Sequence, residues 1–501
     1  MPFVPAPTSL GTSPLPTPGE QPPTARAVRF GVMAALSILV VALAIGQLFL
    51  NNILFLTPGL QAQAGGAVAG QGGATFQGFV FGWTRRDTGG GYQTAASLGN
   101  MKSQANLFHM NAVIIKVVAD MPARSESDIF WHSTDKNNLD TLPDADYLRA
   151  IQDARKAGLV PILELEVRQQ DTVLSRGDES PSLVGATWSS LHSNQVVGLE
   201  NGSTGVIGTL EKTWFDNYTA FAVHFAQISQ SLHLPYFIFG DGLTNVSYDT
   251  SATSAQADPG GIDRSVPGDV PCPKTASGRR ECEWRHVIQA LRNSKYALLM
   301  NHAQTEQGGG YTGKLIYAAS WSGASDGGAT KPEFEQISWW DAVSYIGLNA
   351  GFPITQNQSD APVNVLDDGW HGRGTGLAGQ GDIFSRLETV AEKYRKQIVF
   401  TAAGYSSAPG ANSAAFTTGN VSAVEDDFEQ LNDMQALLTT FTGTAWWAGV
   451  FWTGDEPVAP RTKQPNWNIS TNWAGDNLAN SKASGKWLAT FYQNAPIACS
   501  C

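Results

Sequence analysis

The sequence is poor in positive charge and in the residues that commonly bind metals. It has 32 Lys and Arg against 44 Asp and Glu, which gives a formal net charge of -12 at pH 7. Because binding to nucleic acid needs clustered Lys and Arg, no nucleic-acid partner is expected. The 8 histidines are dispersed and form no His-x-x-x-His pair, so neither a metal site nor a cofactor is expected.

Cysteine is also scarce, with 4 in the chain. Cys272 and Cys282 flank a loop rich in Pro, Lys, Gly and Arg, and in an oxidising exterior we expect a disulfide between them. Such a bond stabilises by roughly 2 to 3 kcal/mol through loop entropy. Two free thiols are the alternative. Cys499 and Cys501 are too close in sequence for an easy direct bond, so their partners are not determined.

One long apolar run lies near the N-terminus. Residues 30–50 are uncharged and mostly apolar, long enough for a helix to cross a hydrocarbon core of ~30 Å. Arg26 and Arg29 precede the run and no Lys or Arg follows until Arg85. The positive-inside rule therefore predicts a cytoplasmic N-terminus and an extracellular remainder. The alternative is a cleaved signal peptide ending near Ala64, although the run is longer than the apolar part of such peptides.

This assignment divides the chain into four parts. Residues 1–27 form a disordered cytoplasmic tail, because they are rich in Pro, Thr and Ser with little to bury. Residues 28–52 form a single transmembrane anchor, and residues 53–76 a flexible Gly/Ala/Gln-rich linker. Residues 77–501 form the extracellular domain.

That domain shows eight short β-rich runs that alternate with amphipathic helical stretches, the pattern of parallel strands joined by crossover helices. It predicts an α/β fold, a closed (β/α)8 TIM barrel, in which the loops after the strands carry function. The long loops at 168–207, 242–282 and 353–378 are the candidates. The predicted strands are Gln77 to Trp83, Ala112 to Ala119, Leu159 to Glu166, Tyr236 to Asp241, Lys314 to Ser320, Val343 to Leu348, Gln397 to Ala402 and Trp447 to Trp452.

Several local motifs within these units resemble one enzyme family. In their order and at barrel spacing they are similar to the clan A glycosidases, most closely to the family 113 beta-mannanase-like barrels, over about residues 77–493. The motifs are Trp214-Phe215-Asp216-Asn217-Tyr218, Phe239-Gly240, Trp339-Trp340-Asp341, Tyr345-Ile346-Gly347-Leu348, Thr401 with Gly404 and Tyr405, and Gly449 with Phe451 and Trp452.

The resemblance implies two catalytic glutamates, and both are missing here. Retaining glycosidases need two carboxyl groups about 5 Å apart, which this clan places at the ends of strands 4 and 7. A family motif Gly-x-Glu-Leu corresponds to Gly240-Asp241-Gly242-Leu243, which puts Gly242 at the acid/base position. A motif Thr-Glu-x-Gly-Tyr puts Ala402 at the nucleophile position. Hydrolysis by the family mechanism is therefore not expected.

Other carboxylates are the fallback candidates for catalysis. Glu164 and Glu166 lie two apart on the third predicted strand and so face the same side, and Asp241 ends the fourth. The plain interpretation is a buried ion-pair network with Lys116. The alternatives are a displaced acid and base that support an inverting mechanism, or a site for hydroxyl groups or a cation.

Aromatic residues near the predicted strand ends are candidates for stacking on sugar rings, although half of them are equally expected to fill the barrel or its loops. Among them, Trp452 is the preferred sugar platform, because clan members commonly carry one after strand 8. The set is Trp83, Trp131, Trp188, Trp321, Phe352, Tyr405 and Trp452.

Three functions remain open at this level. The favoured one is a membrane-anchored pseudo-glycosidase whose barrel mouth binds carbohydrate without cleaving it. The second is an active glycoside hydrolase with relocated carboxylates, and the third is a cell-surface structural or interaction domain. The fold alone does not choose among them, and the oligomeric state is not determined.

Overall fold

The computed structural model describes most of the predicted domain and none of the chain before residue 75. The predicted tail and anchor therefore lie outside the described residues, as do Trp83, Trp188, Gly242 and Cys272. Among the helices that are described, none is long and apolar enough to cross a membrane. The described residues are 75–81, 92, 95–121, 129–131, 141–169, 194–198, 204–241, 243, 246–248, 278–293, 310–322, 331–356, 360–373, 381–413, 426–455 and 481–494.

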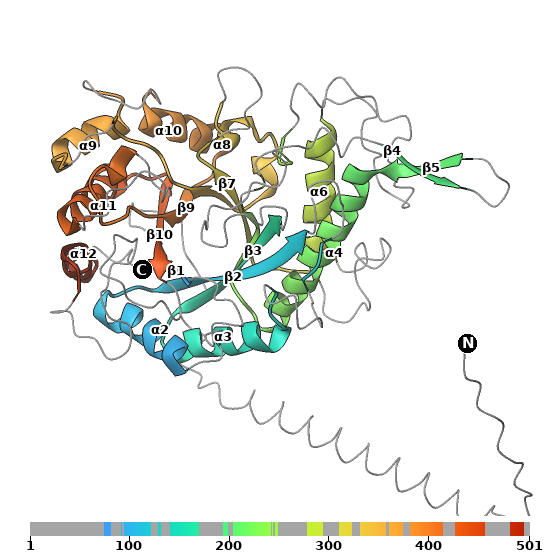
Figure 1. Cartoon of the computed structure of the whole chain (residues 1–501), viewed down its shortest axis with the longest axis horizontal. Coiled ribbons are helices and arrows are strands. Elements are labelled where there is room, and N and C mark those ends of the chain that lie inside the picture. The colour runs from blue at the N-terminus through green and yellow to red at the C-terminus, as the bar shows by residue number, and fades with distance from the viewer. Residues whose placement is uncertain are drawn as a thin grey trace, which may run out of the picture. The chain divides into compact units, whose positions relative to one another are not determined.

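Eight parallel strands form a closed barrel in the order β1-β10-β9-β8-β7-β6-β3-β2. Figure 1 shows these strands at the centre of the domain with helices around them. The predicted barrel is thus confirmed, with strand ends within a few residues of those expected from the sequence. The strands are β1 (Phe76–Phe81), β2 (Ala112–Met121), β3 (Val160–Gln169), β6 (Tyr236–Asp241), β7 (Lys314–Ser320), β8 (Tyr345–Asn349), β9 (Ile398–Ala403) and β10 (Trp447–Asp455).

The helices follow the strands in sequence, as the crossover pattern requires. Helix α3 shows why such segments form helices. Asp144 and Asp146 lie in its first turn and Arg155 and Lys156 in its last turn, so acidic and basic side chains each lie at the end where the helix dipole stabilises them. The helical elements are α2 (Ala95–Leu107), α3 (Asp144–Lys156), α4 (Leu210–Ser231), α6 (Arg279–Arg292), α8 (Glu333–Gln336), η3 (Trp340–Ala342), α9 (Val363–Trp370), α10 (Ile383–Tyr394), η4 (Ala411–Ser413), α11 (Asp427–Phe441) and α12 (Ala483–Asn494).

Two apolar clusters make up the core. The larger combines outward-facing strand residues with the inner faces of the helices. The smaller contains strand residues and no helix residue, so it fills the interior of the barrel. Its members include Phe76, Ile114, Ile162, Ile238 and Val399, which lie in the first halves of their strands. The interior is therefore apolar toward the N-terminal ends of the strands.

Glu333, at the start of α8, ties together the segments that follow β6 and β7. Its Oε1 accepts hydrogen bonds from Ser247 Oγ at 2.5 Å and Tyr317 Oη at 2.9 Å. Its Oε2 accepts one from the Ser320 backbone N-H at 2.6 Å. Because Glu333 is fully buried, it gives these donors an acceptor in a region that water does not reach.

The long loops contain more regular structure than the sequence analysis indicated. The segment 168–207 includes the end of β3 and an antiparallel hairpin of β4 (Asn194–Gly198) and β5 (Thr204–Thr209). The segment 353–378 includes α9. The Val, Ile and Thr residues of these two strands explain the hairpin, because β-branched side chains favour strands. Cys282 in α6 is disulfide-bonded, but Cys272 lies outside the described residues, so the pairing of these two stays a prediction.

Candidate functional site

A cluster of charged side chains occupies the interior of the barrel toward the C-terminal ends of the strands. Residues alternate between the two faces of a strand, so Lys116 faces inward two residues after Ile114, and Glu164 does so two residues after Ile162. Lys116 and Glu164 are direct partners in the β2–β3 ladder. The strand pattern thus places an amine and a carboxylate side by side above the apolar interior.

Lys116 is the centre of this cluster and contacts all three fallback carboxylates. Its Nζ lies 2.8 Å from Glu164 Oε2 and 3.5 Å from Glu166 Oε2, and it donates a hydrogen bond to Asp241 Oδ2. The predicted ion-pair network is therefore present, and the prediction that Glu164 and Glu166 face the same side is confirmed. We call Lys116, Glu164, Glu166 and Asp241 the Lys116 cluster.

Asp241 reaches the interior through an irregularity in its strand. Simple alternation after Ile238 would place Gly240 inside and Asp241 outside, but the register of β6 against β7 shifts between Ile238 and Asp241. Asp241 Oδ1 accepts a hydrogen bond from Asn349 Nδ2, and Asn349 Oδ1 accepts one from Thr401 Oγ1 at 3.2 Å. The polar network therefore extends from β2 across the barrel to β8 and β9.

The cluster is mostly buried but not sealed. The side chain of Lys116 keeps 13% of its surface exposed, whereas those of Asp241 and Glu164 keep 3% and 0%. Burial alone lowers the pKa of Lys116, but the three carboxylates, with Asp241 the strongest, outweigh it and hold that pKa well above its usual value. Burial raises the pKa of Glu164 to about 8, and attraction to Lys116 offsets this only in part.

Ala402 lies where a carboxylate from β9 would enter the mouth of the barrel. It pairs with Asn349 across β8 and β9, after a register shift between Leu348 and Asn349. Its side chain packs on the interior cluster and is half-buried. The position thus faces the interior at the C-terminal end, yet it carries a methyl group. Gly242 lies outside the described residues, so its assignment to the acid/base position stays a prediction.

The preferred sugar platform, Trp452, packs away from the mouth. It is 2% exposed and belongs to the cluster between strands and helices, and its indole Nε1 donates to Tyr492 Oη of α12 at 2.9 Å. The expectation of an open groove lined by this ring does not fit that position, because neighbouring residues of β10 alternate and Phe451 takes the inward face. Phe352 and Tyr405 are likewise buried in the outer layer.

Two other aromatic candidates remain partly exposed. Trp131 packs on Phe221 of α4, with ring centroids 5.5 Å apart, and so lies over the helix layer. Trp321 follows β7 directly, and its backbone N-H donates to the Asn349 carbonyl at 3.2 Å. Its ring lies 6.1 Å from that of Phe352. Trp321 is therefore the described aromatic candidate that lies beside the end of β8, next to the polar network.

An acidic group was not anticipated from the sequence. Carboxylate oxygens of Asp360, Asp426 and Glu429 lie within 4.8 Å of one another. Local structure accounts for it: Asp426 caps α11 by accepting from the N-H groups of Phe428 and Glu429. Glu429 Oε2 in turn accepts from the Asp360 N-H at 2.7 Å. We therefore interpret this group as a helix cap tied to a loop.

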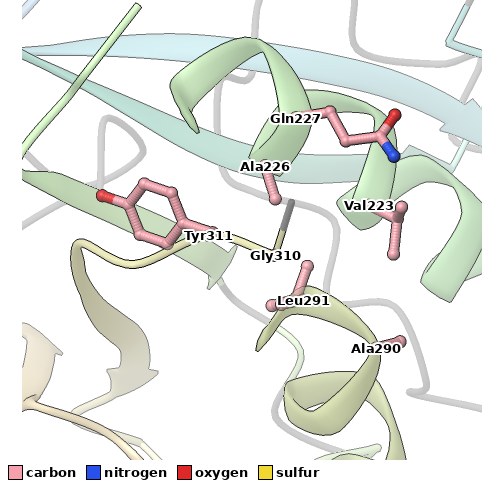
Figure 2. A pocket seen from close by; sticks show the side chains of 7 residues that line it. All are labelled: Val223, Ala226, Gln227, Ala290, Leu291, Gly310 and Tyr311. Atoms are coloured by element: carbon pink, nitrogen blue, oxygen red, sulfur yellow. The ribbon is translucent and has the colours of Figure 1, made fainter. Parts of the chain in front are cut away.

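A small crevice lies on the flank of the barrel, away from the C-terminal ends of the strands. Figure 2 shows its lining residues, which come from α4, α6 and the segment before β7, among them Ala226, Leu291 and Tyr311. Its volume of about 10 Å³ holds no more than about one water molecule. It is too small for a sugar ring.

Asn349 and Thr401 belong to the polar network but were not predicted from the sequence. One predicted strand ended at Leu348, one residue before Asn349. Another included Thr401, but neither Asn349 nor Thr401 was predicted to face the interior. Alternation from Tyr345 and Gly347 was a usable signal for Asn349. Alternation from Val399 was a usable signal for Thr401, whereas the register shift between β8 and β9 that accompanies the inward position of Ala402 has no signal in the sequence.

Comparison with known proteins agrees with this architecture. Residues 269–468 match the model of Glycoside Hydrolase Family 113. The fold is similar to that of a family 113 beta-1,4-mannanase in a complex, with 16% identity, a TM-score of 0.53, and coverage of 84% of this chain and 99% of that chain. It is also similar to the family 113 beta-mannanase of Alicyclobacillus acidocaldarius in complex with ManMIm, with 16% identity, a TM-score of 0.52, and coverage of 84% and 98%. No curated protein matches the sequence. The resemblance to the family 113 beta-mannanase-like barrels is therefore confirmed, and the chain has their (β/α)8 fold.

Proposed function

We propose that this chain binds carbohydrate at the C-terminal mouth of its barrel and does not hydrolyse it by the retaining mechanism. The observation that carries the proposal is the division of the barrel interior. Its first layers are apolar, whereas the layer at the C-terminal ends presents Lys116, Asp241 and Asn349. Barrel enzymes bind their substrates at that end, and sugars need such polar groups to orient their hydroxyls.

The absence of cleavage is proposed from Ala402 and the Lys116 cluster. A methyl group neither attacks an anomeric carbon nor transfers a proton, and Ala402 lies at the end of β9 facing the interior. Among the described residues, the carboxylates of Glu164, Glu166 and Asp241 all gather around one amine. Two-carboxylate hydrolysis needs an acid and a second carboxylate on opposite sides of the bond that breaks, and this arrangement favours binding instead.

The similar proteins support a sugar as the ligand. Both family 113 structures carry the name of a beta-mannanase, so mannans and related β-linked glycans are the first candidates. We also propose that residues 30–50 anchor the chain in a membrane with the barrel outside, since that placement would expose the mouth to external glycans. Release of the chain by detergent but not by high salt or carbonate would support the anchor, and recovery in the soluble fraction would refute it.

The binding proposal is tested by filling the mouth. In Ala402→Trp the large ring occupies the half-buried interior position, and we expect at least a tenfold loss of glycan affinity by calorimetry. Leu148→Trp is the matched control, because it adds the same ring on the outer surface of α3, where Leu148 is 36% exposed. Equal affinities for the two variants, with both folded by circular dichroism, would place any glycan site elsewhere.

A further inference from the structure

Phe130 presents an exposed aromatic ring beside the C-terminal end of β2. Its side chain is 45% exposed, and its backbone forms an antiparallel bridge with Asp120, the penultimate residue of β2. The Phe130 N-H donates to the Asp120 carbonyl at 2.8 Å, and the Asp120 N-H donates to the Phe130 carbonyl at 2.8 Å. This pair of hydrogen bonds fixes the backbone of Phe130 against the strand, so the ring has a defined position without being buried.

The strand register determines which way this ring faces. Alternation along β2 carries the inward face of Lys116 to Asp120, which lies further toward the C-terminal end of the same strand. Residues directly opposite each other in an antiparallel pair have their side chains on the same face. Phe130 therefore faces the barrel axis, on the side of the sheet that bears the Lys116 cluster.

The two neighbours of Phe130 provide an independent check of this direction. If Phe130 faces the axis, Ile129 and Trp131 should face the helices, because successive side chains of an extended segment alternate. Ile129 is buried in the cluster between strands and helices, and Trp131 packs on the same cluster, against Phe221 of α4. These two side chains anchor the segment from behind and leave the Phe130 ring on the open side.

The position of Phe130 also distinguishes it from the other exposed apolar side chains of the described residues. The other large ones, Leu148 and Phe428, lie on helices α3 and α11, where single exposed apolar residues are common. Phe130 instead lies on the strand face that surrounds the mouth. Because a strand rises about 3.3 Å per residue, Asp120 and its partner lie roughly 13 Å beyond Lys116 along β2. That span accommodates more than one sugar ring between the polar network and Phe130.

We infer that Phe130 is a sugar-stacking platform of the barrel mouth, against which one ring of a β-linked glycan packs its C-H face. An aromatic face offers apolar area to those C-H groups, whereas the sugar hydroxyls need polar partners, which Asp241 and Asn349 supply further inside the barrel. Phe130 thus takes the role that was predicted for Trp452, which packs outward. The inference rests on the proposed function, because it adds a binding residue to the same site.

The test first measures binding of β-1,4-mannohexaose, cellohexaose and xylohexaose to the full chain by calorimetry, and then assays variants with the tightest of the three. Phe130→Leu keeps an apolar side chain but removes the flat aromatic face, so we expect at least a tenfold loss of affinity. Phe130→Tyr keeps the ring and should retain the wild-type affinity. If Phe130→Leu does not fold, Phe130→Val replaces it, because a β-branched side chain suits an extended segment.

Phe428→Leu is the matched control, because it makes the same change in a ring that is 68% exposed on α11, and it should bind as the wild type does. Urea denaturation should show Phe130→Leu close to the wild type in stability, which separates loss of the platform from loss of the fold. Unchanged affinity in folded Phe130→Leu, or an equal loss in Phe130→Tyr or Phe428→Leu, overturns the inference and leaves the proposed function standing. No binding of any of the three oligomers to the wild type overturns both.

Discussion

Replacement of Lys116 by Met tests whether the charged cluster exists as the structure has it. The substitution keeps an unbranched side chain one atom shorter and removes the amine that three carboxylates share. Removing one partner of a buried ion pair typically costs about 3 to 5 kcal/mol, because a buried charge is left without compensation. Such a loss is a large part of the ~5 to 15 kcal/mol that stabilises most domains.

The structure indicates the lower end of that range. Asp241 retains the amide of Asn349 as a partner, and Glu164, whose pKa is about 8, already accepts a proton at neutral pH. We therefore expect Lys116→Met to lower the free energy of unfolding by about 3 kcal/mol at pH 7. The loss should shrink as the pH is lowered toward 5, since protonation neutralises the carboxylates that remain.

The assay is urea denaturation followed by tryptophan fluorescence, with two comparisons. Lys156→Met is the matched control, because Lys156 lies 3.4 Å from Asp153 with 55% of its side chain exposed, and such pairs contribute about 0 to 1 kcal/mol. In the double variant Lys116→Met with Asp241→Asn, stability should recover in part, because both partners are then uncharged. A loss of free energy of unfolding under about 1 kcal/mol that is independent of pH, with no recovery in the double variant, would show that Lys116 does not hold these carboxylates in a buried ion-pair cluster.

Three further outcomes follow from the same contacts. Glu333→Ala removes the acceptor that three buried donors share, so it should lower the free energy of unfolding by about 3 to 5 kcal/mol in urea denaturation. Glu335→Ala breaks a partly exposed ion pair in the same short helix and should cost about 1 kcal/mol or less. The pKa of Glu164 is about 8 in the folded state, against an ordinary value of 4.5. Between pH 4.5 and about 8, the folded protein therefore holds a proton on Glu164 that the unfolded protein has lost. Stability should therefore fall as pH rises through that window, and Glu164→Gln should flatten the curve; an unchanged curve would contradict the shift. The double variant Gly242→Glu with Ala402→Glu should show measurable hydrolysis of an activated aryl β-mannoside. The control, Gly242→Glu with Ala402→Gln, has no second carboxylate and should show none. Equal activity of the two double variants would disprove the assignment of Ala402 to the nucleophile position.

The sequence was sufficient for the barrel but not for the orientation of its side chains. Strand content, turn residues and helix spacing predicted each strand to within a few residues, because burial on both faces of a parallel strand leaves a strong apolar signal. Alternation also predicted that Glu164 and Glu166 share a face with each other. These predictions depend on local geometry that every regular strand obeys.

The remainder depends on irregular pairing, which local sequence does not encode. A register shift turns Asp241 inward, and another brings Ala402 to the same interior. Trp452 was predicted at the mouth by resemblance, but it packs outward on Tyr492. Each of these outcomes is decided by the neighbouring strand or helix, so it follows from tertiary packing and not from periodicity.

If the barrel mouth binds sugar without cleaving it, the wild-type full chain must retain a glycan and release no product from it. The chain is incubated with β-mannans, glucans, xylans and amine-bearing glycans, and both bound ligand and released reducing ends are recorded on the same sample. We expect saturable binding that is abolished in Ala402→Trp, and release of reducing ends no faster than in a sample without protein. Sustained release that is lost in Asp241→Asn or Glu166→Gln would contradict it and would show an active hydrolase with relocated carboxylates.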